Sequence, residues 1–496
     1  MDRQIRRLGL GLLFLFLLLL GQVNYVQFIA AEEIADNPAN AYRQLVAEYV
    51  VDRGDMLAKD GTTVLAMSKR SPGAFVFERR YPHGPLYAGI TGYYSLYYGR
   101  TELEQTFDDY LSGDAAELLP TTFADLVLGR PKQGASIVTT IDPLVQQVAT
   151  DQIADLPEGG AVAAIDPESG DIIALASNPT FDPNRLATLD PKAVREAWDE
   201  LNADPENPLL SRANDELYPP GSTFKIVTAS AALENGFGPD SLWPNPHELD
   251  LPLTTHGLSN FGSKTCPGGS RISLAYALQI SCNVVFGGIG LELGADKMAA
   301  QAHAYGFAPD AASGDVDADI PFQEGVFPDP ASFVQREPAL AFSAIGQQDV
   351  AANPLQLALV AGAIANDGIL MRPRLVTEVR DPQGRVVRAF PPEEATRPID
   401  ERSAARLTDM MVSVVEDGTG WRAAVPGTTV AGKTGTAQHR KGAKPHAWFV
   451  AFAPAENPEV AVAVLVLDGG SLGDDATGGE LAAPIAKAVI EAGLET

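Results

Sequence analysis

The chain has 496 residues, and its 36 Lys and Arg against 64 Asp and Glu give a formal net charge of -28. This acidity argues against a nucleic-acid binder, because neutralising phosphates requires clustered cations. With 45% hydrophobic and 20% charged residues, the composition is that of a globular protein, and the length allows two or three domains.

The first predicted element is a membrane helix. The segment from Leu8 to Ala31 carries no charge and is long enough to cross the hydrocarbon core. Residues 1–7 before it hold three Arg and one Asp, so the positive-inside bias predicts a cytoplasmic tail and an extracytoplasmic remainder. The alternative is a cleaved signal peptide, but Ile29-Ala30-Ala31-Glu32 is a poor cleavage site. We therefore expect a single-pass anchor retained in the cell membrane.

Two domains are expected after the anchor. Residues 32–158 mix short alternating strands with acidic helices and end in a β-branched run (137–141) and an amphipathic helix (142–156). Residues 159–496 begin with two apolar runs, 161–165 and 172–175, joined by a tight loop that favours a hairpin. Strands are predicted again at 429–437, 447–452 and 460–467, before a helix at 481–492. Strands at both ends with helices between them indicate an α+β sheet completed by both ends of this region.

A serine and a lysine lie one helical turn apart in the middle of the chain. The segment Tyr218-Pro219-Pro220-Gly221-Ser222-Thr223-Phe224-Lys225 predicts a rigid turn entering a helix, since prolines are tolerated only at a helix start. Ser222 and Lys225 then share one face, where a neutral amine could take the proton of the hydroxyl. Burial and a helix N-terminus both disfavour the ammonium form. Alone, such a pair more often marks only a capped, solvated helix.

Two further motifs raise the weight of a catalytic interpretation. Ser281-Cys282-Asn283 and Lys433-Thr434-Gly435-Thr436 each occur once, in the motif order of penicillin-recognising serine acyltransferases. With the serine turn counted as the first motif, these are the second and third motifs. In the second motif, the serine could relay a proton and the asparagine could orient a substrate. In the third motif, the glycine would leave space for a substrate backbone at a sheet edge, while the lysine and both threonine hydroxyls would hold a carboxylate.

With these motifs, the chain resembles the class B penicillin-binding proteins, which are monofunctional D,D-transpeptidases. The likeness extends to Arg53–Gly61, to Gly160–Asn184 and to short stretches at 346–347, 353–356 and 366–368. In size, in its short N-terminal domain and in Cys282, it is most similar to the actinobacterial penicillin-binding protein A group. The resemblance implies a dimerisation-type N-terminal domain and a β-lactamase-like transpeptidase domain, with an antiparallel sheet flanked by helices.

The resemblance also implies a mechanism and partners. Ser222 would attack the penultimate D-Ala of a peptidoglycan stem peptide, with Lys225 as base, and the acyl group would pass to an amine of a neighbouring strand. Ser281 and Lys433 would help to protonate the leaving group, and the N–H groups of Ser222 and Thr436 would form the oxyanion hole. β-Lactams would acylate Ser222. No cofactor is expected; a membrane glycosyltransferase and divisome proteins are the expected partners, in wall synthesis linked to division.

The two cysteines and six histidines suggest no metal site. Cys266 and Cys282 are too few for a thiolate cluster. In an oxidising compartment they are expected to form a disulfide, worth about 3 kcal/mol in the chain-entropy model, and the alternative is a pair of buried free thiols. The histidines show no ligand spacing, so no metal is expected, and His446 is expected at the surface.

Other functions share parts of the motif set. A β-lactamase would be shorter and would need a group that activates a deacylating water, and no Glu-x-x-x-Asn segment lies between the second and third motifs. A bifunctional class A enzyme would need a glycosyltransferase domain, for which residues 32–158 are too short. A D,D-carboxypeptidase stays open on motifs alone. A non-enzymatic divisome scaffold is disfavoured because Ser222, Lys225 and Lys433 are all present.

Overall fold

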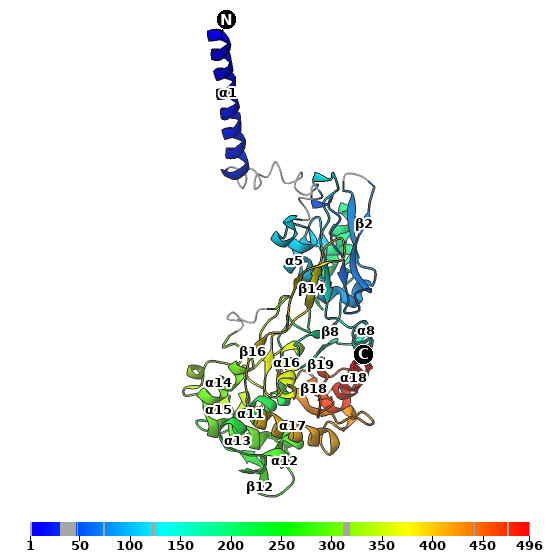
Figure 1. The fold of residues 1–496 in the computed structure, drawn as a ribbon. Coiled ribbons are helices and arrows are strands. Elements are labelled where there is room, and N and C mark those ends of the chain that lie inside the picture. The colour runs from blue at the N-terminus through cyan, green and yellow to red at the C-terminus, as the bar shows by residue number, and fades with distance from the viewer. Residues whose placement is uncertain are drawn as a thin grey trace.

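The computed structural model describes residues 2–29, 46, 48–72, 75–120, 125, 127–310, 318–440, 442–473 and 476–495. Within them, one helix is long and apolar enough to cross a membrane. It runs as α1 (Asp2–Asn24) and continues in a π-helical turn (Tyr25–Ile29). Within Arg3–Gln27, an 18-residue window reaches a mean hydropathy of 1.9 and is not buried against the protein, and α1 stands apart from the remainder in Figure 1. These features are consistent with a single membrane anchor.

The N-terminal domain is built on a six-stranded sheet in the order β15-β14-β6-β1-β2-β3. Four strands come from the N-terminal part of the chain: β1 (Met56–Leu57), β2 (Val64–Arg70), β3 (Phe77–Arg80) and β6 (Ser136–Thr139). The other two, β14 (Val376–Arg380) and β15 (Val386–Ala389), come from far along the sequence, and β14 pairs antiparallel with β6. The two domains are therefore joined by a shared sheet as well as by the chain between them.

A buried ion-pair cluster fixes the short helices of this domain. Glu104, in α5 (Glu102–Thr106), is fully buried and accepts hydrogen bonds from Arg53 Nε at 2.7 Å and Arg79 Nε at 2.6 Å. Arg53 also binds Asp108 of α6 (Asp108–Leu111). Charged groups are buried at such a position only when they are paired, so the cluster ties both helices to the strands.

The larger domain is organised by a five-stranded antiparallel sheet in the order β17-β18-β19-β7-β8, as the sequence predicts. Its C-terminal strands are β17 (Ala431–Ala437), β18 (His446–Ala453) and β19 (Val460–Val466), and its N-terminal strands are β7 (Gly160–Ile165) and β8 (Ile172–Asn178). Every residue of β18 and β19 is buried, because helices cover both faces.

Two layers of helices cover the sheet, one on each face. One contains α18 (Gly478–Gly493) and α8 (Pro143–Ile153), which pack on each other and on the sheet. The other layer includes α16 (Pro354–Ala365) and α17 (Glu401–Glu416) and extends into the helical region that carries α11. Figure 1 shows this region beside the sheet, with the C-terminus near α8.

The remaining helices and strands connect these layers. The helices are α4 (Ala88–Thr91), α9 (Asn184–Ala187), α10 (Pro191–Ala203), α11 (Lys225–Glu234), α12 (Leu274–Gln279), α13 (Asn283–Leu293), α14 (Ala295–Ala304) and α15 (Glu337–Ser343). The short strands pair two by two: β4 (Tyr94–Ser95) with β5 (Gly99–Arg100), β9 (Leu242–Pro244) with β12 (Arg271–Ser273), β10 (Glu248–Leu249) with β11 (Leu258–Ser259), and β13 (Leu370–Met371) with β16 (Glu394–Thr396).

Candidate active site

The serine turn lies between the sheet and the helical region. Ser222 is in a short 3-10 turn (Gly221–Phe224) that leads directly into α11. The turn is held from both sides: Gly221 N donates to Gly346 O at 2.8 Å, and Trp448 Nε1 of β18 donates to Pro219 O at 3.0 Å. Its neighbours are buried while Ser222 is only half-buried, so the hydroxyl is the accessible part of a rigid turn.

Lys225 is fully buried at the first position of α11. Its Nζ donates to Ser281 O at 2.8 Å and to Asn283 Oδ1 at 2.7 Å, and it lies 3.3 Å from Ser281 Oγ. Burial, and then the nearby charge of Lys433, lower the pKa of Lys225 well below its ordinary value. A neutral amine has two N–H groups and one lone pair. If the two shorter bonds use the N–H groups, the lone pair is left to accept a proton.

The second motif lies where α12 gives way to α13. Ser281 has a positive φ of 59°, a conformation that non-glycine residues adopt rarely, and Asn283 is the first residue of α13. Asn260 Oδ1 accepts the N–H groups of Asn283 at 2.8 Å and of Val284 at 3.1 Å. It therefore caps the helix from a distant loop, which the sequence analysis missed because the capping side chain is not adjacent in sequence.

The predicted disulfide is present beside this motif. Cys266 and Cys282 are bonded, with their Cα atoms 6.1 Å apart. Asn245 Nδ2 donates to Cys266 O and to Gly269 O, both at 2.8 Å. The loop that precedes the second motif is thus held by one covalent bond and by hydrogen bonds to the strand region around β9.

The third motif lies on β17, the edge strand. Lys433 is fully buried, and its Nζ donates to Ser281 Oγ and to Thr434 O, both at 2.9 Å. Burial lowers the pKa of Lys433 to about 7. Thr434 Oγ1 lies 2.7 Å from Thr419 Oγ1, and Thr436 is half-buried. Ser281 Oγ is thus within reach of both lysines, and the structure brings all three motifs into one site.

Gly435 lies in close contact with the serine turn. A Cβ at this position would lie 2.8 Å from Trp448 Cβ and 2.9 Å from both Pro220 O and Thr223 Cγ2. The serine turn thus fills the space next to this glycine. The absence of a side chain lets the serine turn approach β17 closely.

His446 is buried rather than at the surface as expected. It begins β18, its ring stacks on that of His439 at 4.1 Å with an interplanar angle of 7°, and its Nδ1 accepts the N–H of Asp468 at 3.2 Å. Burial lowers its pKa to about 4. Ligand atoms of these three residues lie within 4.8 Å of one another. Ring lone pairs lie in the ring plane, however, so two parallel rings do not converge on one ion, and we assign no metal here.

Comparison with known proteins identifies the class. Residues 160–491 match the penicillin-binding protein transpeptidase domain, and residues 53–137 match the penicillin-binding protein A dimerisation domain. The chain belongs to the penicillin-binding protein transpeptidases. Over its full length it is 42% identical to the peptidoglycan D,D-transpeptidase PbpA of Mycolicibacterium smegmatis, covering 99% of that protein, and 39% identical to PbpA of Mycobacterium tuberculosis, also covering 99%.

Solved structures agree with this assignment. Penicillin-binding protein A from M. tuberculosis, as its ceftriaxone acyl-enzyme complex, superposes with a TM-score of 0.84 at 39% identity, over 90% of this chain and 100% of that one. The penicillin G acyl-enzyme complex of the same protein gives 0.82 at 39% identity, with the same coverage. The predicted family and fold class are thus confirmed.

Proposed function

We propose that this protein is a peptidoglycan D,D-transpeptidase that cross-links stem peptides ending in D-Ala-D-Ala through an acyl-enzyme on Ser222. The observation that carries the proposal is the convergence of Lys225 and Lys433 on Ser281 Oγ, at 3.3 Å and 2.9 Å, next to the serine turn. Family membership and the acyl-enzyme complexes of the mycobacterial relative support the same chemistry.

In the acylation step, Ser222 Oγ attacks the carbonyl carbon of the penultimate D-Ala, and its proton passes to the neutral Lys225 amine. The tetrahedral oxyanion is held by the N–H groups of Ser222 and Thr436, a contribution usually worth several kcal/mol. The C–N bond to the terminal D-Ala then breaks, and the leaving amine takes a proton relayed through Ser281, which accepts a hydrogen bond from Lys433.

In the second half-reaction, an amine from a neighbouring strand attacks the ester carbonyl. It loses a proton to the same base, and Ser222 leaves with a proton returned to its oxygen. Lys433, Thr434 and Thr436 hold the terminal carboxylate of the donor peptide on β17, and the free strand edge aligns its backbone. A β-lactam enters the first step and stays as an ester on Ser222.

The proposal extends to location and partners. The apolar helix α1 with Arg3, Arg6 and Arg7 before it supports a cytoplasmic N-terminus and an extracytoplasmic catalytic domain. We propose division-linked wall synthesis together with a membrane glycosyltransferase and divisome proteins, through the N-terminal domain. The division into residues 1–7, 8–31, 32–158 and 159–496 stays a prediction.

The test is a transfer assay with the full-length protein in detergent. A synthetic stem peptide ending in D-Ala-D-Ala is incubated with and without an acceptor amine, and products are separated by mass. Transpeptidation predicts an acceptor-linked product and release of D-Ala that depend on Ser222. Release of D-Ala by hydrolysis alone, whatever the acceptor concentration, would favour the carboxypeptidase alternative, and rapid turnover of a chromogenic cephalosporin would favour a β-lactamase.

A further inference from the structure

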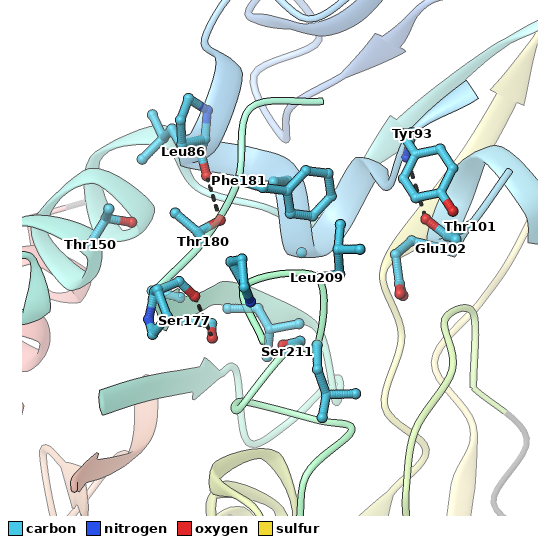
Figure 2. A pocket seen from close by; sticks show the side chains of 18 of the residues that line it. Leu86, Tyr93, Thr101, Glu102, Thr150, Ser177, Thr180, Phe181, Leu209 and Ser211 are labelled. Atoms are coloured by element: carbon cyan, nitrogen blue, oxygen red, sulfur yellow. Dashed lines mark hydrogen bonds between the residues drawn. The ribbon is translucent and has the colours of Figure 1, made fainter. Parts of the chain in front are cut away.

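A cavity of about 200 Å³ lies where the N-terminal domain meets the transpeptidase domain (Figure 2). One wall comes from α4 and the start of α5. The other comes from α8, the end of β8, α10 and the segment 208–211. None of the described residues that line it belongs to the three catalytic motifs, so the cavity is a separate feature of the molecule.

Most of the wall is apolar and rigid. Leu86, Phe181 and Leu209 line the cavity, and Figure 2 shows Phe181 and Leu209 near its centre. Trp198 stacks on Tyr98 with ring centroids 4.1 Å apart and makes an edge contact with Tyr93 at 6.4 Å. An apolar cavity of about 150 Å³ accepts a benzene molecule, so this one suits a single ring or a short alkyl chain.

A carboxyl group closes one end of the cavity. Glu102 lines it, and its Oε2 is buried without a hydrogen-bond partner. The residue also has a positive φ of 48°, a strained conformation for a side-chain-bearing residue. The adjoining segment is fixed, since Thr101 N donates to Tyr93 O at 3.2 Å. The carboxyl group is therefore held in place beside an apolar space.

A second carboxyl group reinforces the negative potential. Burial and the charge of Asp215 raise the pKa of Glu102, and burial raises the pKa of Asp215 to about 6. Asp215 accepts from Ser211 N at 3.3 Å and from Asn214 Nδ2 at 3.0 Å. No ion pair involves either carboxyl group within the part of the chain that the structure describes. Above pH 6 the pair thus keeps at least one negative charge that no protein cation neutralises.

We propose that this cavity binds a small organic cation, with a primary ammonium group against Glu102 and a ring or short alkyl body between Phe181 and Leu209. The ammonium supplies the donor that Glu102 Oε2 lacks and the positive charge that the carboxyl pair lacks, while the apolar walls take the body. A neutral ligand of the same shape makes only the apolar contacts with the walls.

The experiment uses benzylammonium and benzyl alcohol as probes, titrated calorimetrically into the full-length protein in detergent at pH 7.5. The proposal predicts that benzylammonium binds at least about tenfold more tightly than benzyl alcohol. It also predicts that Asp215→Asn, which keeps the size but removes the charge, weakens benzylammonium at least about tenfold and leaves benzyl alcohol nearly unchanged. Equal affinities for the two probes, equal affinity of benzylammonium for wild type and Asp215→Asn, or no saturable binding of benzylammonium, would overturn it.

Two further variants serve as a control and as a second test. Glu158→Gln removes a carboxylate from an exposed position and is expected to leave both affinities unchanged. Glu102→Gln removes the carboxyl group from the cavity wall while the charge of Asp215 stays, and it is expected to weaken benzylammonium by a smaller factor. Labelling of Ser222 by a fluorescent penicillin checks that each variant is folded. If Asp215→Asn does not label, Glu102→Gln decides: loss of benzylammonium affinity supports the proposal, and unchanged affinity contradicts it.

Discussion

Lys433 Nζ donates a hydrogen bond of 2.9 Å to Ser281 Oγ across a separation of 152 residues, and this contact joins the edge strand of the sheet to the start of α13. Ser281 O in turn accepts from Lys225 Nζ at 2.8 Å. The catalytic site is thus a bridge between the sheet and the helical region. Each of the two lysines is buried at some cost in stability.

Replacing Lys433 by Met is expected to stabilise the protein while abolishing acylation by penicillin. Its folded-state pKa is lowered to about 7 from 10.5, so the unfolded state binds more protons between these values and burial of the lysine is a net penalty at pH 7. Loss of its two hydrogen bonds offsets part of the gain, which leaves an increase of about 1–3 kcal/mol in the free energy of unfolding.

The pH dependence of stability tests whether Lys433 is a net penalty in the folded protein. Wild-type stability should rise from pH 7 towards pH 10, as the unfolded state loses its extra proton, so the advantage of Lys433→Met should shrink over that range. Thermal melting at both pH values measures it. A variant that melts below the wild type at pH 7, or an advantage that grows with pH, would be inconsistent with a buried lysine of lowered pKa.

Breaking the Cys266–Cys282 bond is expected to weaken both stability and acylation, because the bond holds the loop next to Ser281 and Asn283. Cys266→Ser should lower the free energy of unfolding by about 2–4 kcal/mol. It should also slow penicillin acylation. Cys282→Ser serves as the matched variant, and a reducing agent should affect the wild type but neither variant. Equal acylation rates before and after reduction would show that the bond does not position the motif.

Removing the cap on α13 should slow acylation through Asn283. Asn260→Ala leaves the N–H groups of Asn283 and Val284 without their acceptor, which typically costs about 1 kcal/mol of stability. A shift of Asn283 also disturbs the bond that Lys225 donates to it. The rate constant for acylation is the measurement, with exposed Asn457→Ala as control. An unchanged rate with a lowered melting temperature would mean that the cap is structural only.

Gly435→Ala is expected to displace the serine turn. Its Cβ would lie 2.9 Å from Pro220 O, and such overpacking typically costs about 1–3 kcal/mol. Because the turn carries Ser222, acylation should fall more steeply than the melting temperature suggests. Gly288→Ala in α13 is the matched control, since a Cβ there meets nothing within 4 Å. If both variants acylate at the wild-type rate, the close approach of the turn to β17 is not required.

The sequence predicted the parts of the site that depend on local pattern or on short motifs. The Ser222–Lys225 spacing, the strands at both ends of the transpeptidase domain and the Cys266–Cys282 pair follow from spacing, pattern and composition. It did not predict that β14 and β15 complete the N-terminal sheet, because that pairing joins Val376 to Thr139 and has no local signal. Asn260 and the burial of His446 were missed for the same reason.

The most direct test of the account is labelling of the full-length protein by a fluorescent penicillin, comparing the wild type with Ser222→Ala and with Ser471→Ala, an exposed serine far from the motifs in sequence. The account predicts one persistent covalent label on the wild type and on Ser471→Ala, located on the peptide containing Ser222, and none on Ser222→Ala. Equal labelling of Ser222→Ala, or no labelling of the wild type, would contradict it.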